Sequence, residues 1–341
     1  MSNRLTLAGW LFRQLAATCT ATALGIIVLA AIAIAENSKS VFVADLKAQN
    51  KKYLSAKLSL PKNKKPKTAA RDWEEKITRR AWDLEDGRLR VSIDLKKSGP
   101  PDGLLFQSPE VTVTIDGKKV IRAEGVESFP DNPVFVIQIA EMDPGNPFPE
   151  VLMSVYTGGA HCCSDTRILT SSRDGRTWKE VEVGQFDGEP LEARDLDGDG
   201  RYELAMRDNS FLYTFGCYAC STAPLQILRL EKGQMINVSA NKAFRKWHVD
   251  NLRRIVEWAS GDSDRNGFLA GYVGQKILLG ESTQAWKLML KHHDAASDWG
   301  LDQCKVKRDD KGECPAGQVE ILKFPVALEL FLKEAGYTVE K

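Results

Sequence analysis

Acidic side chains alternate with glycines in residues 195–203, which read Asp-Leu-Asp-Gly-Asp-Gly-Arg-Tyr-Glu. Such oxygen ligands suit Ca²⁺, which takes about six to eight of them in a flexible shell. We expect one calcium ion to be held by the carboxylates of Asp195, Asp197, Asp199 and Glu203 and by the backbone carbonyl of Arg201. Without the ion, the carboxylates would repel one another. The competing interpretation is an acidic surface turn, because Asp-Gly pairs are common in turns.

The segments beside this loop are strand-like, which separates it from an EF-hand. An EF-hand has a helix on each side and a bidentate Glu as its last ligand, where this chain has Met206. At these residues the chain resembles the calcium loops of FG-GAP/VCBS repeats in integrin-type β-propellers. Those repeats usually have Asp at the place of Glu203. The resemblance implies that calcium braces a blade of a binding or scaffold protein and takes part in no reaction.

Residues 140–153 and 193–206 share one plan, an acidic turn followed by a Glu and a buried strand. Glu150 and Glu203 define a repeat of roughly fifty residues, the size of a propeller blade. Prolines replace most ligands in the first copy, so we assign no calcium there. A third, degenerate unit starts near Trp82. These units are too few for a closed propeller, and we expect a partial propeller-like or sandwich-like β domain.

Alternation and helical spacing divide the rest of the chain. Apolar residues alternate with polar ones along residues 89–95 and 111–115, and Asp116-Gly117 then predicts a β-hairpin. Beyond Ala243 the apolar spacing becomes helical, which predicts a small all-α C-terminal domain. The fold class is therefore mainly β with an added helical domain.

Cysteines gather in two loops that occupy equivalent places in the two copies, residues 158–163 and 216–220. The loops are therefore candidates to meet in space. Beyond Cys19, the chain has Cys162, Cys163, Cys217, Cys220, Cys304 and Cys314. All six are disulfide candidates, because an even number of cysteines in an exported chain favours pairing. Cys304 and Cys314 would close a short charged loop between helices.

Four interpretations of the cysteine loops stay open. Disulfides between the two loops are the first. A zinc site formed by His161 and thiolates is the second. The third is redox exchange through Cys217 and Cys220. In the fourth, Cys162 or Cys163 is a nucleophile and His161 its base, although adjacent residues of a strand point to opposite faces.

The N-terminus carries a targeting signal. Arg4 and Arg13 precede an apolar run over residues 15–35, which ends in Ala33-Ile34-Ala35. This pattern is typical of a secretory signal peptide cleaved near Ala35, yet the run is also long enough for a transmembrane helix in the inner membrane. Both outcomes place the remaining chain outside the cytoplasm, in the periplasm or cell envelope or, after cleavage, secreted.

The 341 residues are enough for about two domains. We expect a signal peptide or anchor in residues 1–35, a Lys-rich flexible linker in 36–80, the β-repeat domain in 81–240 and the helical domain in 241–341. The 47 basic and 46 acidic residues give no basic excess for nucleic-acid binding.

These features predict an exported, calcium-stabilised, non-catalytic binding or scaffold protein. Its partners would be an envelope protein or a glycan, with a membrane contact through the N-terminal segment. The alternative is a periplasmic hydrolase or a thiol or metal enzyme centred on His161 and the cysteines at 162, 163, 217 and 220. The chain contains no Gly-x-Ser-x-Gly, His-Glu-x-x-His or Gly-rich phosphate motif.

Overall fold

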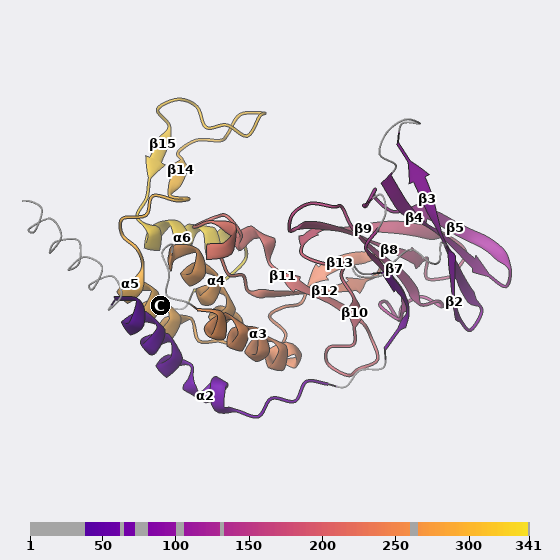
Figure 1. Ribbon diagram of the computed structural model, residues 1–341, viewed down its shortest axis with the longest axis horizontal. Coiled ribbons are helices and arrows are strands. Elements are labelled where there is room, and N and C mark those ends of the chain that lie inside the picture. Colours follow the sequence, from indigo (N-terminus) through magenta and orange to yellow (C-terminus); the bar gives the residue numbers. More distant parts are fainter. Residues whose placement is uncertain are drawn as a thin grey trace, which may run out of the picture.

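The computed structural model describes residues 38–61, 65–71, 81–99, 106–129, 133–259 and 265–339. Antiparallel sheets make up the middle of the chain, and a helical region follows (Figure 1). The predicted combination of a mainly β part and a C-terminal helical region is confirmed at this level. The predicted signal peptide or anchor, residues 1–35, lies outside the described residues. Among the residues described, no helix combines the length and the apolar character needed to cross a bilayer.

The first sheet is a four-stranded meander in the order β2-β3-β4-β5. Its strands are β2 (Ala81–Asp86), β3 (Leu89–Ser98), β4 (Phe106–Ile115) and β5 (Lys118–Glu124). Leu89, Val91 and Ile93 point into the core from alternate positions of β3. Asp116 and Gly117 join β4 to β5 with φ of 49° and 77°, as the favoured two-residue hairpin turn requires. The hairpin predicted from the sequence is confirmed.

The second and third sheets repeat the meander. The second has the order β1-β6-β7-β8-β9 and the third the order β10-β11-β12-β13, with every neighbouring pair antiparallel. The strands are β1 (Lys67–Arg71), β6 (Phe135–Ala140), β7 (Glu150–Tyr156), β8 (Cys162–Ser171), β9 (Trp178–Asp187), β10 (Ala193–Arg194), β11 (Glu203–Arg207), β12 (Leu225–Glu231) and β13 (Gln234–Asn237).

Strand β7 links the three sheets, because it is buried along its whole length. Val151 and Met153 belong to the core shared with the first sheet, whereas Leu152 belongs to the core shared with the third. Alternate residues of a strand point to opposite faces, so the second sheet lies between the other two. Substitutions at adjacent positions of β7, such as Val151 and Leu152, would therefore disturb different cores.

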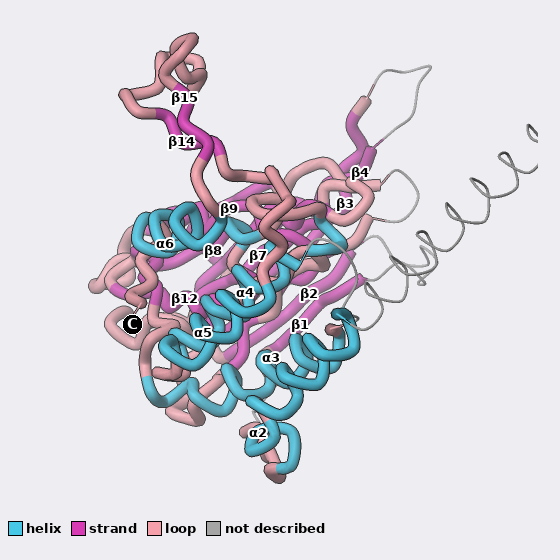
Figure 2. Tube along the Cα trace, turned by 90° about the vertical axis from the view of Figure 1, so that its left-hand side faces the viewer, coloured by secondary structure: helices cyan, strands magenta, loops and turns pink. Residues whose placement is uncertain are grey.

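The helical region contains η3 (Lys242–Phe244), α3 (Arg245–Trp258), α4 (Arg265–Leu278), α5 (Ser282–His292) and α6 (Phe324–Glu334). Figure 2 shows these helices in front of the strands. A hairpin of β14 (Asp302–Cys304) and β15 (Val319–Ile321) projects between α5 and α6 (Figure 1). The predicted Cys304–Cys314 disulfide closes its loop.

For residues 38–61 and 65–71, the structure corrects the expectation of a flexible linker over residues 36–80, the rest of which lies outside the described residues. Residues 38–49 and α2 (Lys51–Ser55) are helical, and β1 adds a strand to the second sheet. Phe42, Leu46 and Tyr53 are buried in the core of the helical region. Their spacing creates an apolar helical face. The average composition of the segment does not reveal this face, because the segment also contains many lysines.

Both ends of the described chain thus build one helical unit, and the sheets lie between them in the sequence. Arg253 of α3 donates from Nε to the carbonyl of Tyr53 at 2.7 Å, and its Nη2 contacts the carbonyl of Ala56. Gln49 donates to the carbonyl of Gln284 at 2.8 Å. The N-terminal helices are therefore part of the same packed unit as α3 and α5.

A buried ion pair holds this junction. Lys276 of α4 is fully buried and contacts Glu281, which also contacts Lys52 and Tyr53 of α2. Burial alone would raise the pKa of Glu281, but the hydrogen bonds from these three groups outweigh it and lower the pKa to about 2. Two helices from opposite ends of the chain therefore share one carboxylate.

We expect Glu281→Gln to lower the free energy of unfolding by about 3 kcal/mol at pH 7, because it leaves the Lys276 ammonium buried without its partner. A carboxyl with a lowered pKa stabilises the fold above its unfolded value near 4.5, and this contribution is lost as the pH falls towards 2. The variant should therefore lose less stability than the parent over that interval. Urea unfolding at several pH values tests this, with Glu257→Gln on the exposed face of α3 as the control. Equal losses in the two variants would contradict it.

Candidate functional site: an acidic loop and two facing cysteine loops

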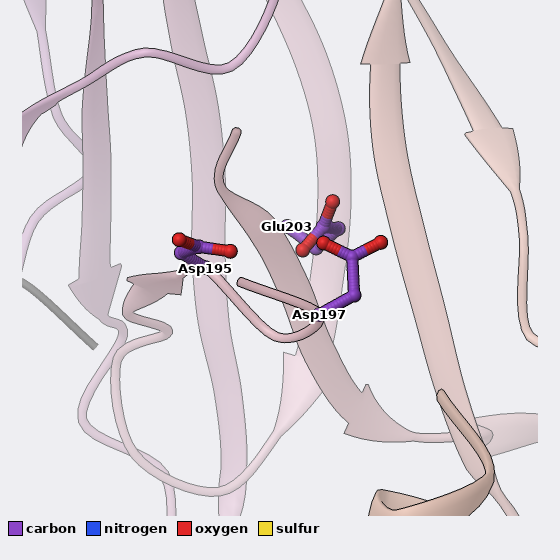
Figure 3. A group of neighbouring side chains, drawn as sticks. All are labelled: Asp195, Asp197 and Glu203. Carbon is purple, nitrogen blue, oxygen red and sulfur yellow. The ribbon is translucent and has the colours of Figure 1, made fainter. Parts of the chain in front are cut away.

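The acidic loop, residues 195–203, connects β10 to β11. The carboxylates of Asp195, Asp197 and Glu203 each offer an oxygen within 4.8 Å of the others (Figure 3). Asp199, also predicted as a ligand, is outside this group, and its side chain is 48% exposed. The structure thus brings together three of the four predicted carboxylates.

Backbone N–H groups fold the loop around its own side chains. Gly198 and Gly200 donate to the two oxygens of Asp195 at 2.7 and 3.1 Å, and Asp199 donates to Asp197 at 3.3 Å. The φ values of Gly198 and Gly200 are 86° and 90°, a region that other residues rarely adopt. The glycines are therefore needed at these two positions of the loop.

Arg229 of β12 places a guanidinium beside these carboxylates, and no sequence motif marks this residue. Its Nη2 lies 3.1 Å from Asp197 Oδ2 and 3.9 Å from Asp199 Oδ2. Its Nε donates to Glu203 Oε1 at 2.9 Å. The loop therefore already has one cation. The loop has four carboxylates, and the guanidinium contacts three of them, so an excess of negative charge remains and the residues fit a further cation electrostatically.

The side chain of Arg201 points away from the acidic loop, towards the second sheet. Its Nε donates to the carbonyl of Met142 at 2.8 Å, and Nη2 contacts the carbonyl of Leu230. Trp247 of α3 also donates a hydrogen bond to the Leu196 carbonyl of the loop, at 2.7 Å. Its backbone therefore lies at the junction of two sheets and the helical unit.

Glu150 and Glu203 occupy matching places in the two predicted copies, and both are fully buried. Glu150 accepts hydrogen bonds from the backbone of Met142 and Asp143 at 2.8 and 2.9 Å, and Glu203 accepts one from Leu196 at 3.0 Å. Burial raises the pKa of both glutamates although these N–H groups oppose it. Each glutamate thus fastens the turn before its own strand.

The partners across the next strand differ between the copies. Thr170 donates its hydroxyl to Glu150 at 2.8 Å, whereas Arg229 takes that place beside Glu203. In the first copy, burial and then the negative charges of Glu150 and Asp143 raise the pKa of Glu141 to about 7. The first copy therefore holds its acidic groups without a guanidinium in the equivalent position.

The two cysteine loops meet, as their equivalent places predict. The rings of His161 and Tyr218 are stacked with centroids 3.9 Å apart. The pairing expected between the loops is wrong, because each loop pairs its own cysteines, Cys162 with Cys163 and Cys217 with Cys220. Cysteines joined in this way supply neither the thiolates of a zinc site nor a free nucleophile.

His161 lies in a polar cluster that the sequence did not predict. Its Nδ1 is 3.4 Å from Asp187 Oδ1, and its Nε2 is 3.1 Å from the hydroxyl of Tyr213. Tyr218 donates its hydroxyl to Asp187 Oδ2 at 2.7 Å. Burial and this hydrogen bond raise the pKa of Tyr218 to about 12. Asp187 comes from β9 and had no motif around it.

A groove of about 440 Å³ lies beside the turn of the first copy. Its wall includes Asp143, Ser171, Trp178, Lys179 and Lys232. Lys179 donates to the carbonyl of Gly233 at 2.9 Å, which joins the β8–β9 hairpin to the β12–β13 turn. The groove thus runs between the second and third sheets.

A family model described as the sll0997 C-terminal domain matches residues 244–336, which span the helical region from α3 to α6. The probable thylakoid lumen protein sll0997 of Synechocystis sp. is 41% identical to this chain over 262 residues, 76% of each protein. This chain belongs to the same family. The uncharacterized protein y4bJ of Sinorhizobium fredii is 35% identical over 237 residues, which are 67% of this chain and 37% of y4bJ. No solved structure matches the chain.

We expect Glu203→Gln to lower the free energy of unfolding by about 3 kcal/mol, because Arg229, with a side chain only 12% exposed, loses its closest partner. Glu182→Gln, an exposed change on β9, is the matched control and should cost under about 0.5 kcal/mol. Chemical unfolding in the absence of divalent cations measures both. A loss as small as that of the control would show that the buried pair does not hold the loop.

Proposed function

We propose that this protein is an exported, non-catalytic binding or scaffold protein whose stacked sheets are braced by a calcium ion in the acidic loop. The observation that carries the proposal is the charge excess at residues 195–203, where Arg229 contacts Asp197, Asp199 and Glu203 and the carboxylate of Asp195 lies close to those of Asp197 and Glu203. Like charges a few ångströms apart repel, and a divalent cation removes that repulsion. The ligands would be Asp195, Asp197, Asp199, Glu203 and the Arg201 carbonyl. Asp195, Asp197 and Glu203 already lie together.

The location of the loop supports a bracing role. Its Leu196 carbonyl accepts from Trp247, and its Arg201 side chain donates to the carbonyl of Met142, in the turn between β6 and β7 of the second sheet. Glu203 and Arg229 connect it to β12. An ion that orders this loop would therefore stiffen three contacts at once, with no substrate or reaction involved.

The sheets support the likeness to FG-GAP/VCBS blades. We take the meanders β2–β5, β6–β9 and β10–β13 as the blades of a partial propeller rather than as a sandwich. The helical unit protects its open end, since Phe244 packs on Leu196 and Ile227 at the third sheet. This arrangement would let three blades persist without closing into a ring.

Three observations support export. The relative in Synechocystis is named a probable thylakoid lumen protein, the sequence of residues 1–35 is typical of a signal peptide or anchor, and three disulfides are formed. We therefore propose a periplasmic or envelope location. Residues 15–35 would either anchor the chain in the inner membrane or be removed near Ala35.

The partner would be an envelope protein or a glycan bound in the groove between the second and third sheets. Lys179 and Lys232 give its wall positive charge, while Trp178 and Ser171 add an indole and a hydroxyl. A concave surface with an aromatic side chain and a few polar groups is typical of ligand sites. The basic side chains favour a partner with acidic groups.

The calcium proposal predicts a ligand-dependent stability. At a free calcium concentration about a hundredfold above the dissociation constant, the ion would add about 2.7 kcal/mol. We expect calcium to raise the melting temperature of the parent protein and Asp197→Asn to abolish the rise, because a central carboxylate is lost. Scanning calorimetry in calcium and in chelator measures it, and Asp310→Asn in the exposed hairpin loop is the control. A parent protein with one melting temperature in both conditions would refute the bracing ion.

Arg229→Thr is a second test, because Thr170 occupies the equivalent place in the first copy. Removal of the guanidinium leaves the carboxylates without any cation in chelator. We therefore expect a lower melting temperature in chelator and a larger calcium-induced rise than in the parent. Titration calorimetry should show tighter calcium binding by about tenfold or more, since about 1.4 kcal/mol corresponds to tenfold. Unchanged affinity would mean that Arg229 and the ion do not share one electrostatic site.

A further inference from the structure

Two short disulfide loops face each other beside a histidine. The Cys162–Cys163 pair begins β8, and the Cys217–Cys220 pair encloses η2 (Tyr218–Cys220). These four cysteines are partly exposed residues. Tyr218, enclosed by the second disulfide, stacks on His161, which precedes the first. Each disulfide is therefore accessible to solvent. Each also lies next to one of the two stacked rings, His161 or Tyr218, in the sequence.

Asp187 provides a buried negative charge for His161. Its side chain is 6% exposed, and its Oδ1 accepts no hydrogen bond from the described residues. This oxygen is 3.4 Å from His161 Nδ1. The other oxygen accepts from Tyr218, and Arg207 is 3.9 Å away. A buried charge is costly unless polar or charged neighbours surround it, and for Asp187 these neighbours are Tyr218, Arg207 and His161.

Tyr213 covers the other side of His161. Its φ is 62°, a conformation that a bulky residue adopts only when its surroundings hold it. Trp299 supplies one such contact by donating to the Tyr213 carbonyl at 2.8 Å. The Tyr213 hydroxyl lies 3.1 Å from His161 Nε2, and this tyrosine is 51% exposed. Protons can therefore pass between His161 and solvent through an exposed phenol.

We propose that the facing loops form a thiol–disulfide exchange site, in which Cys217–Cys220 reacts with a dithiol of a partner protein and His161 supplies and recovers the proton. The grounds are geometric: the Cys217–Cys220 disulfide is partly exposed, His161 stacks on Tyr218 inside that disulfide loop, and the buried carboxylate of Asp187 lies 3.4 Å from His161 Nδ1. The same arrangement would not be needed to stabilise a loop, for which the disulfide alone suffices.

The exchange takes two steps. A thiolate of the partner attacks the sulfur of Cys217 or Cys220, which forms a mixed disulfide and breaks the Cys217–Cys220 bond. The departing thiolate takes a proton from His161. The partner's second thiol then loses its proton to His161, attacks its own mixed disulfide and releases the second cysteine, which is protonated from solvent. The partner dithiol is oxidised to a disulfide, and Cys217 and Cys220 are reduced to thiols.

The Cys304–Cys314 disulfide is an internal control in the same chain, since it closes the loop of the β14–β15 hairpin. The experiment equilibrates the full-length protein with mixtures of reduced and oxidised dithiothreitol, alkylates the free thiols and maps each pair by mass spectrometry. We expect Cys217–Cys220 to be half-reduced at a lower ratio of reduced to oxidised reagent than Cys304–Cys314 requires, by at least about tenfold. For a two-electron couple, a tenfold difference in this ratio is a difference of about 30 mV in reduction potential. Equal or reversed ratios would overturn the proposal.

His161→Phe tests the proton carrier, because it keeps a ring against Tyr218. We expect the pH at which the reduced Cys217–Cys220 pair becomes half-reactive with iodoacetamide to rise by about 1 unit, since a neighbouring imidazolium favours the thiolate. His293→Phe, near the end of α5, is the matched control and should leave that pH unchanged. A profile for His161→Phe that coincides with the control would reject His161 as the acid. The outcome is independent of calcium, so the bracing proposal stands or falls separately.

Discussion

A buried glutamate at the first residue of a strand governs the β part of this protein. Glu150 opens β7 and Glu203 opens β11, and each accepts backbone hydrogen bonds from the turn that precedes it. A buried carboxylate is tolerated only while donors surround it, so neither turn can move without exposing its glutamate to an apolar core. Because β7 contributes to two cores, the turn, the strand and the packing of the sheets depend on one another.

The two copies balance the same buried charge with different chemistry. Around Glu150 the donors are neutral, and the Thr170 hydroxyl and the Asn146 amide lie 2.8 and 2.7 Å from Oε1. Around Glu203 the guanidinium of Arg229 donates hydrogen bonds to the buried carboxylate and also donates to Asp197. A guanidinium offsets the charge of further carboxylates nearby, whereas a neutral hydroxyl does not. The guanidinium stands beside the turn with three aspartates, and the hydroxyl beside the turn with one aspartate and three prolines.

Features set by a few neighbouring residues could be predicted from the sequence. The Asp116-Gly117 hairpin and the Cys304–Cys314 bridge are of this kind. Contacts made across the chain could not. Arg229 is separated from Glu203 by 26 positions and lies in a strand without a motif, and Phe42 packs on Phe268 at 5.7 Å between ring centroids. Alternation and composition describe local geometry, so they carry no information about such partners.

The position of the acidic loop gives its charge a wider effect. Residues 38–55 and the C-terminal helices form one unit. The chain therefore leaves this unit, forms the sheets and then returns to it. Leu196 packs on Phe244 and accepts from Trp247 at that return point. Repulsion among carboxylates in the same turn would loosen the contact on which the sheets rest against the helices. Neutralisation there by Arg229, and by the cation that we propose, would therefore act on the arrangement of both units and not on the loop alone.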